Sequence, residues 1–487
     1  MLNERHQMLF KIETSDGTPA TPGVNDGVLV YEPKCDDDPS FLDRRPSGRS
    51  LSQQFKPPGL KMRRMTFKSD VRGSGAVGTA PEWSKLARAC SMRETNLISI
   101  AMSSVAAAER FMVGQLVYQG TDLASATAVG ICVTDLRGAN GTVLISPISG
   151  TFSNTTTKAI TIDASGAEVV TASATAAAPT TSGVGFGYLP DSERIMQLSV
   201  NSWTGPHPDT ALGAILTITD TDGHVKGAAQ IVSGTSGGLW DTTFQVQLLF
   251  GSVANGDLIG NTALAIGAVN AVPLQTRGVS LTGYSNVDGF ARIASGMRGT
   301  FSMDGEAGSN FVFSWDMLGK PQQHLAQLAV ATGVLNTVRP PRLFGAFAGF
   351  RTAAGFFKLP ISKIAHNQGN TVGPREDVNQ PGGSLGTFVT ARKPVTSIEF
   401  EDVNLGFDVI KFLDEGTLVG FGCVVGGDGS GTHAGRTAGN TCVFAVPQGQ
   451  IIGLSDGEKN GVKTWNVEIE AQGVLGAGDD ELVIASF

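Results

Sequence analysis

The chain has few charged residues and no long apolar run. Charged side chains make up 16% of its 487 residues, and the formal net charge is −8. Tight binding to a phosphate backbone needs a basic stripe, so this balance argues against a protein that grips nucleic acid. No window of about 18 apolar residues indicates a membrane span, and the start of the sequence lacks the apolar core of a signal peptide. We therefore expect the chain to fold in the cytoplasm, without a membrane span.

Cysteine and histidine are also scarce, and neither has the spacing of a metal site. The five cysteines are widely spread and form no CxxC pair: Cys35, Cys90, Cys132, Cys423 and Cys442. We interpret them as free thiols, buried as small apolar side chains in a protein of a reducing compartment. The six histidines are scattered. We predict no metal and no cofactor.

Two short patterns match catalytic or phosphate-binding motifs only in part. Ser236 lies in a G-x-S-x-G sequence, but the segment after it reads as a strand, whereas a nucleophile elbow needs a helix there. His433 lies in a glycine-rich loop that has no GK[ST] ending and opens no helix. No pair of carboxylates and no Cys/His arrangement stands out. We predict that the protein is not an enzyme.

Glycine is abundant, at 63 of 487 residues, and Thr, Ser, Val and Ala fill the runs between the glycines. This composition favours a mainly β protein with many turns, and the length favours more than one domain. We divide the chain into three parts: 1–96, the first part of a core with an N-terminal arm; 97–275, one or two inserted β-rich modules with little charge; and 276–487, the second part of the core.

A glycine-rich loop leads directly into a short helix within Val71–Thr95. Thr79 and Glu82 have the spacing of a capping box. Gly73, Gly75 and Gly78 would allow a sharp reversal before the helix. Three residues recur on one face of that helix and are assigned to core packing: Trp83, Leu86 and Cys90.

Three segments, 61–72, 297–318 and 394–402, alternate between apolar and polar residues, which predicts strands with one packed and one wet face. The Asp-Gly turn within 297–318 predicts a hairpin. Lys68 and Arg72 are basic exceptions on the polar side of the first segment. The other polar-face residues are Thr66, Asp70, Thr300, Ser302, Asp304, Ser314, Asp316, Glu399 and Glu401.

Further elements are expected around these strands. The Pro-rich link 338–343 precedes a region that reads as loop-like to about residue 385, and 404–415 reads as a short helix. Later segments have β patterning: 417–425, 440–447, 461–471 and 481–486.

Opposite charges cluster near the N-terminus. Three consecutive carboxylates cannot converge on a cation as the alternate-position ligands of a calcium loop do. The segment is therefore interpreted as a solvated loop or as an arm that forms salt bridges with a neighbouring copy. The residues concerned are Asp36, Asp37, Asp38, Arg44, Arg45 and Arg49.

Three blocks together resemble the major tail tube proteins of long-tailed double-stranded DNA bacteriophages. They are the strand with GSGAVGTAPEWSKLARACSMRET at 61–95, NVDGFARIASGMRGTFSMDGEAGSNFVFSWDMLG at 286–319, and the C-terminal strands ending in GVKTWNVEIEAQGVLGAGDDELVIASF. The blocks occur in the family's order and cover roughly half of the chain.

The resemblance implies a tail-tube-type β-sandwich or barrel with a flanking α-helix and long loops. It implies six copies in a ring, with rings stacked into a tube that holds the tape-measure protein and later the DNA. Tail terminator and tail tip proteins would bind the two ends. The protein would belong to the virion tail and be assembled in the host cytoplasm. The polar strand faces would line the channel, where carboxylates repel phosphates and let DNA slide.

The insertion at 97–275 departs from the compact family pattern. A module of that size would block the channel or the contact between rings, so we expect it to project outward. Bulky decoration leaves little room for a sheath, which favours a non-contractile tail. The alternatives are the inner tube of a contractile tail, which predicts a smooth exterior, and a glycan-binding adhesin or tail-surface receptor-binding protein.

Overall fold

The computed structural model describes most of the chain. The described residues are 6–14, 16–41, 56–106, 109–123, 125–162, 168–188, 195–200, 215–219, 225–234, 242–251, 258–259, 266–270, 279–287, 290–322, 325–326, 335–352, 355–378, 382–402, 407–473 and 481–487.

The protein is mainly β, as the sequence predicts, and it divides into two compact units. The smaller unit is Leu189–Arg277, an antiparallel six-stranded sheet in the order β16–β13–β14–β15–β12–β17. Its strands are β12 (Ile195–Val200), β13 (Ile215–Thr219), β14 (Val225–Gly234), β15 (Thr242–Gly251), β16 (Leu258–Ile259) and β17 (Ile266–Asn270). The larger unit comprises Met1–Tyr188 and Gly278–Phe487.

The larger unit contains a first group of strands that we call the first repeat. Its sheet order is β2–β1–β18–β19–β20–β4–β3, and all of these pairs are antiparallel. Its elements are β1 (His6–Ile12), β2 (Gly27–Val28), β3 (Tyr31–Phe41), β4 (Pro58–Asp70), α1 (Ser84–Ala89), β18 (Leu281–Val287), β19 (Phe290–Glu306) and β20 (Val312–Pro321). A 3-10 turn (Val24–Asp26) and β21 (Leu325–Ala326) flank it.

A second group, which we call the second repeat, has the sheet order β23–β22–β28–β29–β30–β27–β24, again antiparallel throughout. Its elements are β22 (Phe347–Thr352), β23 (Gly355–Phe357), β24 (Ile361–Asn367), β27 (Val395–Glu401), α2 (Val409–Glu415), β28 (Leu418–Val425), β29 (Cys442–Lys459) and β30 (Val462–Ala471). A hairpin of β25 (Thr371–Glu376) and β26 (Ser384–Ala391) lies between β24 and β27, and β31 (Val483–Ser486) follows β30.

The two repeats have the same topology. The elements β1, β2, β3, β4, α1, β18, β19 and β20 of the first repeat correspond in chain order to β22, β23, β24, β27, α2, β28, β29 and β30 of the second. With this correspondence the two sheet orders are identical. The pairing irregularities also correspond: between β18 and β19 the register shifts after Leu281–Met297, and between β28 and β29 it shifts after Val419–Gly449. Because both order and bulge position recur, we conclude that the larger unit contains one β fold twice.

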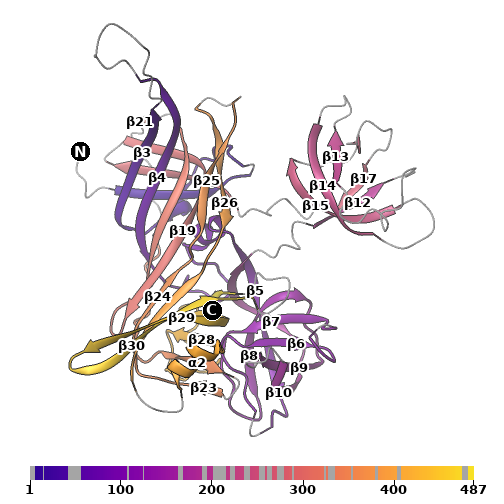
Figure 1. Ribbon diagram of the computed structural model, residues 1–487, viewed down its shortest axis with the longest axis vertical. Coiled ribbons are helices and arrows are strands. Elements are labelled where there is room, and N and C mark those ends of the chain that lie inside the picture. Colours follow the sequence, from indigo (N-terminus) through magenta and orange to yellow (C-terminus); the bar gives the residue numbers. More distant parts are fainter. Residues whose placement is uncertain are drawn as a thin grey trace. The chain divides into compact units, whose positions relative to one another are not determined.

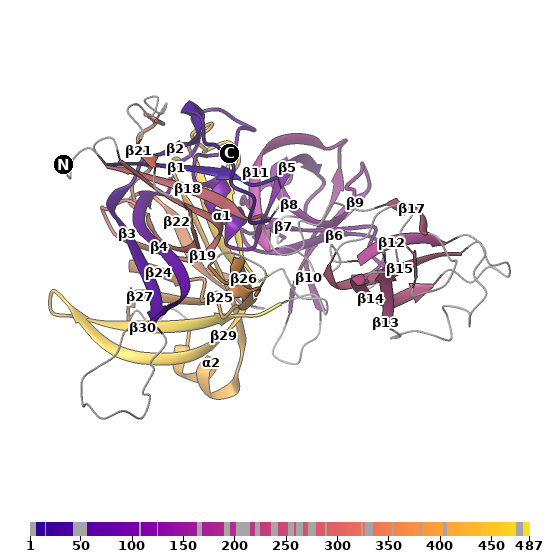
Figure 2. The same cartoon turned by 90° about the horizontal axis from the view of Figure 1, so that it is seen from above.

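The two repeats are joined edge to edge into one sheet. β19 of the first repeat pairs with β24 of the second, and this pairing is here called the joint. The result is an eight-stranded run, β3–β4–β20–β19–β24–β27–β30–β29, which we call the wall (Figure 1). The sheet is bent into a partial ring, and Figure 2 shows wall strands curving from β3 toward β29.

Seven further strands are inserted between α1 and β18, before the smaller unit. They pack around two buried apolar clusters, which include Leu97, Ile131, Ile160, Phe111 and Val143. β11 also pairs with the C-terminal strand β31, so this module is attached to the second repeat. The strands are β5 (Met92–Ser103), β6 (Leu116–Gln119), β7 (Ala128–Cys132), β8 (Gly141–Gly150), β9 (Thr156–Ile162), β10 (Glu168–Ala176) and β11 (Thr180–Tyr188).

The helix of the opening glycine-rich stretch begins later than the capping-box prediction placed it. α1 begins at Ser84 after Trp83, whose side chain makes no capping bond, so the Thr79–Glu82 capping box is wrong. The Glu82 carboxylate instead accepts hydrogen bonds from Arg72, and both side chains are largely buried. This ion pair takes the carboxylate that would have reached back to Thr79.

Two other expectations change. The region that follows the Pro-rich link, to about residue 385, is not loop-like, because β22, β23, β24 and β25 lie in it. These strands are short and broken by Gly and Pro, which hides their alternation. The predicted helix at 404–415 is α2, which begins only at Val409, after Asp408 accepts the Lys411 N–H as N-cap. Gly416 ends it with a φ of 64°, a left-handed conformation that suits glycine.

Candidate assembly surface

The wall has one apolar and one polar face. On the apolar side, rows of opposed residues enter the core, such as Phe67–Trp315–Phe301 in the first repeat. The neighbouring row on the other side includes Thr66 and Asp316, which are partly exposed. Alternation with a period of two separates the faces, because successive side chains in a strand point to opposite sides.

Most of the residues predicted to line a channel lie together on this polar face. They are exposed or partly exposed, and they come from four wall strands: Thr66, Thr300, Ser302, Asp304, Ser314, Asp316, Glu399 and Glu401. Asp70 differs, since it is 7% exposed and accepts a hydrogen bond from the Tyr31 hydroxyl at 2.7 Å. That hydrogen bond raises the pKa of Tyr31. Arg72, one of the two basic exceptions, is also buried.

In the first repeat, two cations on the polar face, Arg64 and Lys68, are paired with acids. Arg64 Nε donates to Asp316 Oδ1 at 2.6 Å, and this hydrogen bond raises the pKa of Arg64. Lys68 Nζ lies 2.8 Å from Glu32 Oε2, and the hydrogen bond lowers the pKa of Glu32. The pairs are solvent-exposed, so each stabilises the fold only slightly. Their effect is to neutralise the charges of Arg64 and Lys68 on this half of the face.

In the second repeat, the polar face is more acidic. Glu399, Glu401 and Glu468 are partly or fully exposed on neighbouring strands, and within the described ranges none of the three has a cationic partner. Their polar neighbours include neutral groups: Ser397 Oγ donates to Asn466 Oδ1 at 2.9 Å, and Thr464 Oγ1 donates to Glu399 Oε1 at 3.4 Å. Unpaired carboxylates on adjacent strands give this half of the face a negative potential.

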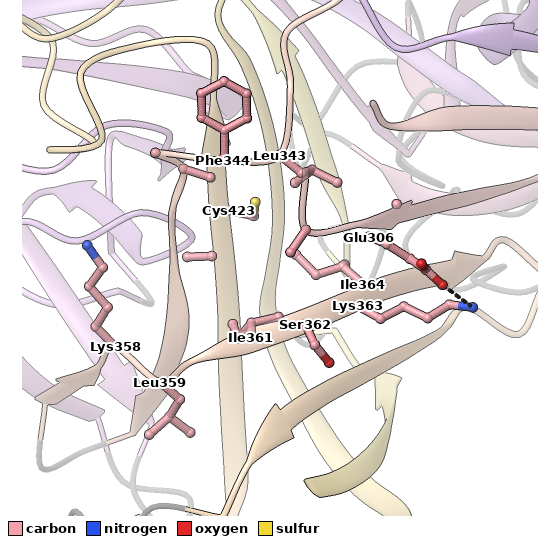
Figure 3. Close-up of a pocket in the computed structure, with 15 residues that line it drawn as sticks. Glu306, Leu343, Phe344, Lys358, Leu359, Ile361, Ser362, Lys363, Ile364 and Cys423 are labelled. Atoms are coloured by element: carbon pink, nitrogen blue, oxygen red, sulfur yellow. Dashed lines mark ion pairs between the residues drawn. The ribbon is translucent and has the colours of Figure 1, made fainter. Parts of the chain in front are cut away.

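The joint between the repeats has its own ion pairs. Residues Ser302–Glu306 of β19 lie antiparallel to Lys363–Asn367 of β24. Lys363 Nζ lies 3.7 Å from Asp304 and 3.8 Å from Glu306. Figure 3 shows the Lys363–Glu306 pair at the rim of a small pocket beside the joint.

This pocket has a volume of about 180 Å³ and is lined by both repeats. Leu343, Ile361 and Ile364 supply apolar walls, and Phe344 is 63% exposed beside it (Figure 3). At its rim Lys363 is paired with Glu306, and the Lys358 ammonium lies over the Phe347 ring. The pocket is smaller than the usual 300–1,000 Å³ of a ligand site, so we assign no ligand to it.

The two long edges of the wall, β3 and the far part of β29, are open. Among the described strands, β3 pairs only with β4, and β29 beyond Ile451 pairs only with β30. Four large apolar side chains are exposed on these edges or on the adjoining hairpin strand: Tyr31, Phe41, Ile452 and Val462. An open edge of this length is a template for pairing with another strand.

The predicted charged arm is only partly described. Asp36, Asp37 and Asp38 lie in β3, so this segment is a strand and not a solvated loop. Arg63 is 2% exposed and donates to both carboxylate oxygens of Asp37, at 2.5 and 3.1 Å. The basic residues of the arm, Arg44, Arg45 and Arg49, lie outside the described residues. Ser236 of the G-x-S-x-G sequence lies outside them too.

The helix-packing residues Trp83, Leu86 and Cys90 are all fully buried in the core. All five cysteines are free and buried, and burial raises the pKa of each one. In the described part of the chain, no group of three His, Cys, Asp or Glu side chains could hold a metal ion. No described helix has the length and apolar character needed to cross a membrane.

Sequence reasoning missed two wall strands as sources of polar-face residues. β30 carries Asn466, Glu468 and Glu470 in alternation with Val467 and Ile469, a pattern that was readable from the sequence. β24 carries Lys363, Ala365 and Asn367 on the polar side, but its seven residues include little alternation of charge with apolar residues.

A scan against protein-family models and a search of curated proteins both give no match for this chain.

Proposed function

We propose that this protein is a structural subunit that self-assembles into stacked rings and forms the tail tube of a long-tailed double-stranded DNA bacteriophage. The observation that carries the proposal is the wall. It is a continuous antiparallel run with one face in the core and one polar face, it is bent into a partial ring, and it ends in two open edges. Further copies can close such a sheet into a barrel with a polar interior.

The polar face suits a conduit for DNA. Glu399, Glu401 and Glu468 would repel phosphates, whereas Arg64 and Lys68 are held by neighbouring acids. A face on which these cations are paired and these carboxylates are unpaired would let the duplex and the tape-measure protein pass without tight binding. Terminator and tip proteins would bind the two ends of the tube. The chemistry is passive conduction, and we assign no catalytic step or cofactor.

The inserted modules support a non-contractile tail. They leave the core between α1 and β18, and α1 is packed with Trp83 and Leu86 in the core beneath the apolar face of the wall. A module that starts on that side can project outward without entering a channel lined by the polar face. Outward decoration would obstruct a contractile sheath.

Negative-stain electron microscopy of the purified protein tests the proposal. We expect sixfold-symmetric or threefold-symmetric rings or tubes with a central channel and outer projections. Dispersed monomers under all conditions, together with binding on a glycan panel, would overturn it in favour of an adhesin. Smooth tubes without projections would instead favour the inner tube of a contractile tail.

A further inference from the structure

The joint pairs the third wall strand of one repeat with the first wall strand of the next. In chain order, β19 is the third wall strand of the first repeat, and β24 is the first wall strand of the second. The open edges of the wall are the same two positions: β3 is the first wall strand of the first repeat, and β29 is the third wall strand of the second. A first and a third wall strand pair with each other at the joint. The strands left open at the two edges of the wall are again a first and a third wall strand.

We propose that β29 of one chain pairs with β3 of the next copy, repeating the joint between chains, and that three chains rather than six close one ring. This inference rests on the proposed function. The partner is a second copy of this chain, because the joint shows that these two strand positions form an antiparallel pair in this fold. Tyr31, which is 44% exposed, lies on the open edge of β3 and would be covered by the pairing.

The equivalence of the repeats gives the register. The row Phe67–Trp315–Phe301 corresponds to Ile398–Val467–Leu454, because both rows follow from the matched bulges. The second wall strands, β4 and β27, therefore correspond with a shift of 331 positions (398 − 67), and the third wall strands with a shift of 153 (454 − 301). Cys35 faces Met65 as His366 faces Thr396, so the first wall strands, β3 and β24, share the shift of 331 from Lys34 onward.

These shifts carry the joint pair Ser302–Asn367 to Ser455 of one chain and Asp36 of the next. They also carry the joint's Glu306 to Lys459. Because the register of β3 shifts between Tyr31 and Lys34, the joint's Lys363 corresponds to Tyr31, the neighbour of Glu32. The contact between chains therefore brings the Lys459 ammonium of one chain close to the Glu32 carboxylate of the next. Glu32 has a side chain that is 68% exposed, so it can be shared between Lys68 and Lys459.

The strand count agrees with three chains. The family resemblance implies six equal units around the channel, and each chain supplies two. At about 4.8 Å between strands, three eight-stranded walls give a circumference of about 115 Å and a backbone diameter of about 37 Å before strand tilt. Six walls would give about 73 Å by the same spacing, far wider than a channel for one duplex requires.

A cysteine pair tests the contact. The double variant D36C/S455C is assembled, mildly oxidised and run on a denaturing gel without reductant. We expect dimers and then a closed trimer as the largest covalent species. The single variants D36C and S455C should give no ladder. The matched control S302C/N367C places the same pair across the joint and should cross-link within one chain, without a gain in mass.

Each other result overturns the inference in a distinguishable way. A ladder that closes at six overturns the three-chain ring. Rings or tubes in the microscope without cross-links, while S302C/N367C still cross-links, overturn the β29–β3 pairing but leave the proposed function standing. Folded protein that forms neither rings nor cross-links overturns the proposed function and this inference together.

Discussion

The two repeats have one topology but carry different side chains at equivalent positions. Phe10 and Phe350 are equivalent and both fully buried, so the pattern of burial is kept there. By contrast, Cys35 is equivalent to His366, and Lys11 to Arg351. The fold is thus specified by which positions are buried, and a position tolerates quite different residues if its neighbours compensate. The differences are where substitutions should separate the two repeats.

The aromatic residue before each helix gives the largest expected effect. Trp83 is fully buried and donates its Nε1–H to the Arg72 carbonyl at 2.9 Å. Its ring packs against that of Phe313, with 5.1 Å between the ring centroids. Phe407 is 7% exposed, and its ring centroid lies 4.7 Å from that of Phe350. We expect W83A to lower the free energy of unfolding by about 3–5 kcal/mol, and F407A by less, because its site is partly open to water.

Chemical denaturation of both variants, with the wild type in parallel, measures this difference. An equal or larger loss in F407A would show that the second repeat, and not the first, holds the more tightly packed helix.

His366 should make the second repeat sensitive to acid. Burial lowers the pKa of His366 from 6.5 to about 4, and its Nδ1 lies 3.0 Å from Thr396 Oγ1. As pH falls below 6.5, the unfolded chain takes up a proton that the folded chain refuses until about pH 4. The free energy of unfolding should therefore decrease between these values, by up to about 3 kcal/mol from this residue.

The variant H366C places in the second repeat the residue found at the equivalent position in the first. We expect the loss of stability between pH 7 and pH 4.5 to be smaller in H366C than in the wild type. Thermal melts at the two pH values give the comparison, and an identical loss in both proteins would contradict the assignment to His366.

The sequence predicted the elements whose apolar and polar residues alternate locally. It did not predict features that depend on contacts with residues elsewhere in the chain. The hairpin 298–318 was predicted correctly because apolar and polar residues alternate along both arms; in the structure its arms pair with Phe301 opposite Trp315. The far part of β29 was missed, because Gly449, Gly453 and Gly457 interrupt its alternation.

The duplication was not predicted at all. Equivalent positions such as Cys35 and His366 share burial but not chemistry, so no repeat is visible in the letters. Eight of the proposed lining residues could be read from alternation, whereas the burial of Asp70 depends on Tyr31 from a neighbouring strand. A partner brought in from elsewhere in the sequence leaves no local signal.

Arg351 and Lys11 occupy equivalent positions in β22 and β1 but differ in burial, so their substitution should affect the two repeats differently. Arg351 is buried, which lowers its pKa to about 10, and it donates to the carbonyls of Val113 and Pro447. Lys11 donates to the Thr21 carbonyl at an exposed site. We expect R351M to cost about 1–3 kcal/mol, since buried acceptors lose their donor, and K11M to change stability by less than about 0.5 kcal/mol. Urea titrations of both variants measure the loss in free energy of unfolding. Equal losses would contradict the prediction that burial makes Arg351 the more important of the two residues.

The polar face should show the smallest effect on stability. Arg64 pairs with Asp316 in the first repeat, and Lys363 pairs with Asp304 at the joint; all four side chains are at least 31% exposed. Exposed pairs contribute about 0.2–1 kcal/mol, so we expect R64Q and K363Q each to lower the free energy of unfolding by less than about 1 kcal/mol. Salt screens such pairs, and at about 1 M ionic strength both variants should approach the wild type. A loss that persists in high salt would mean that the aliphatic stem of the side chain, and not its charge, stabilises that half of the wall.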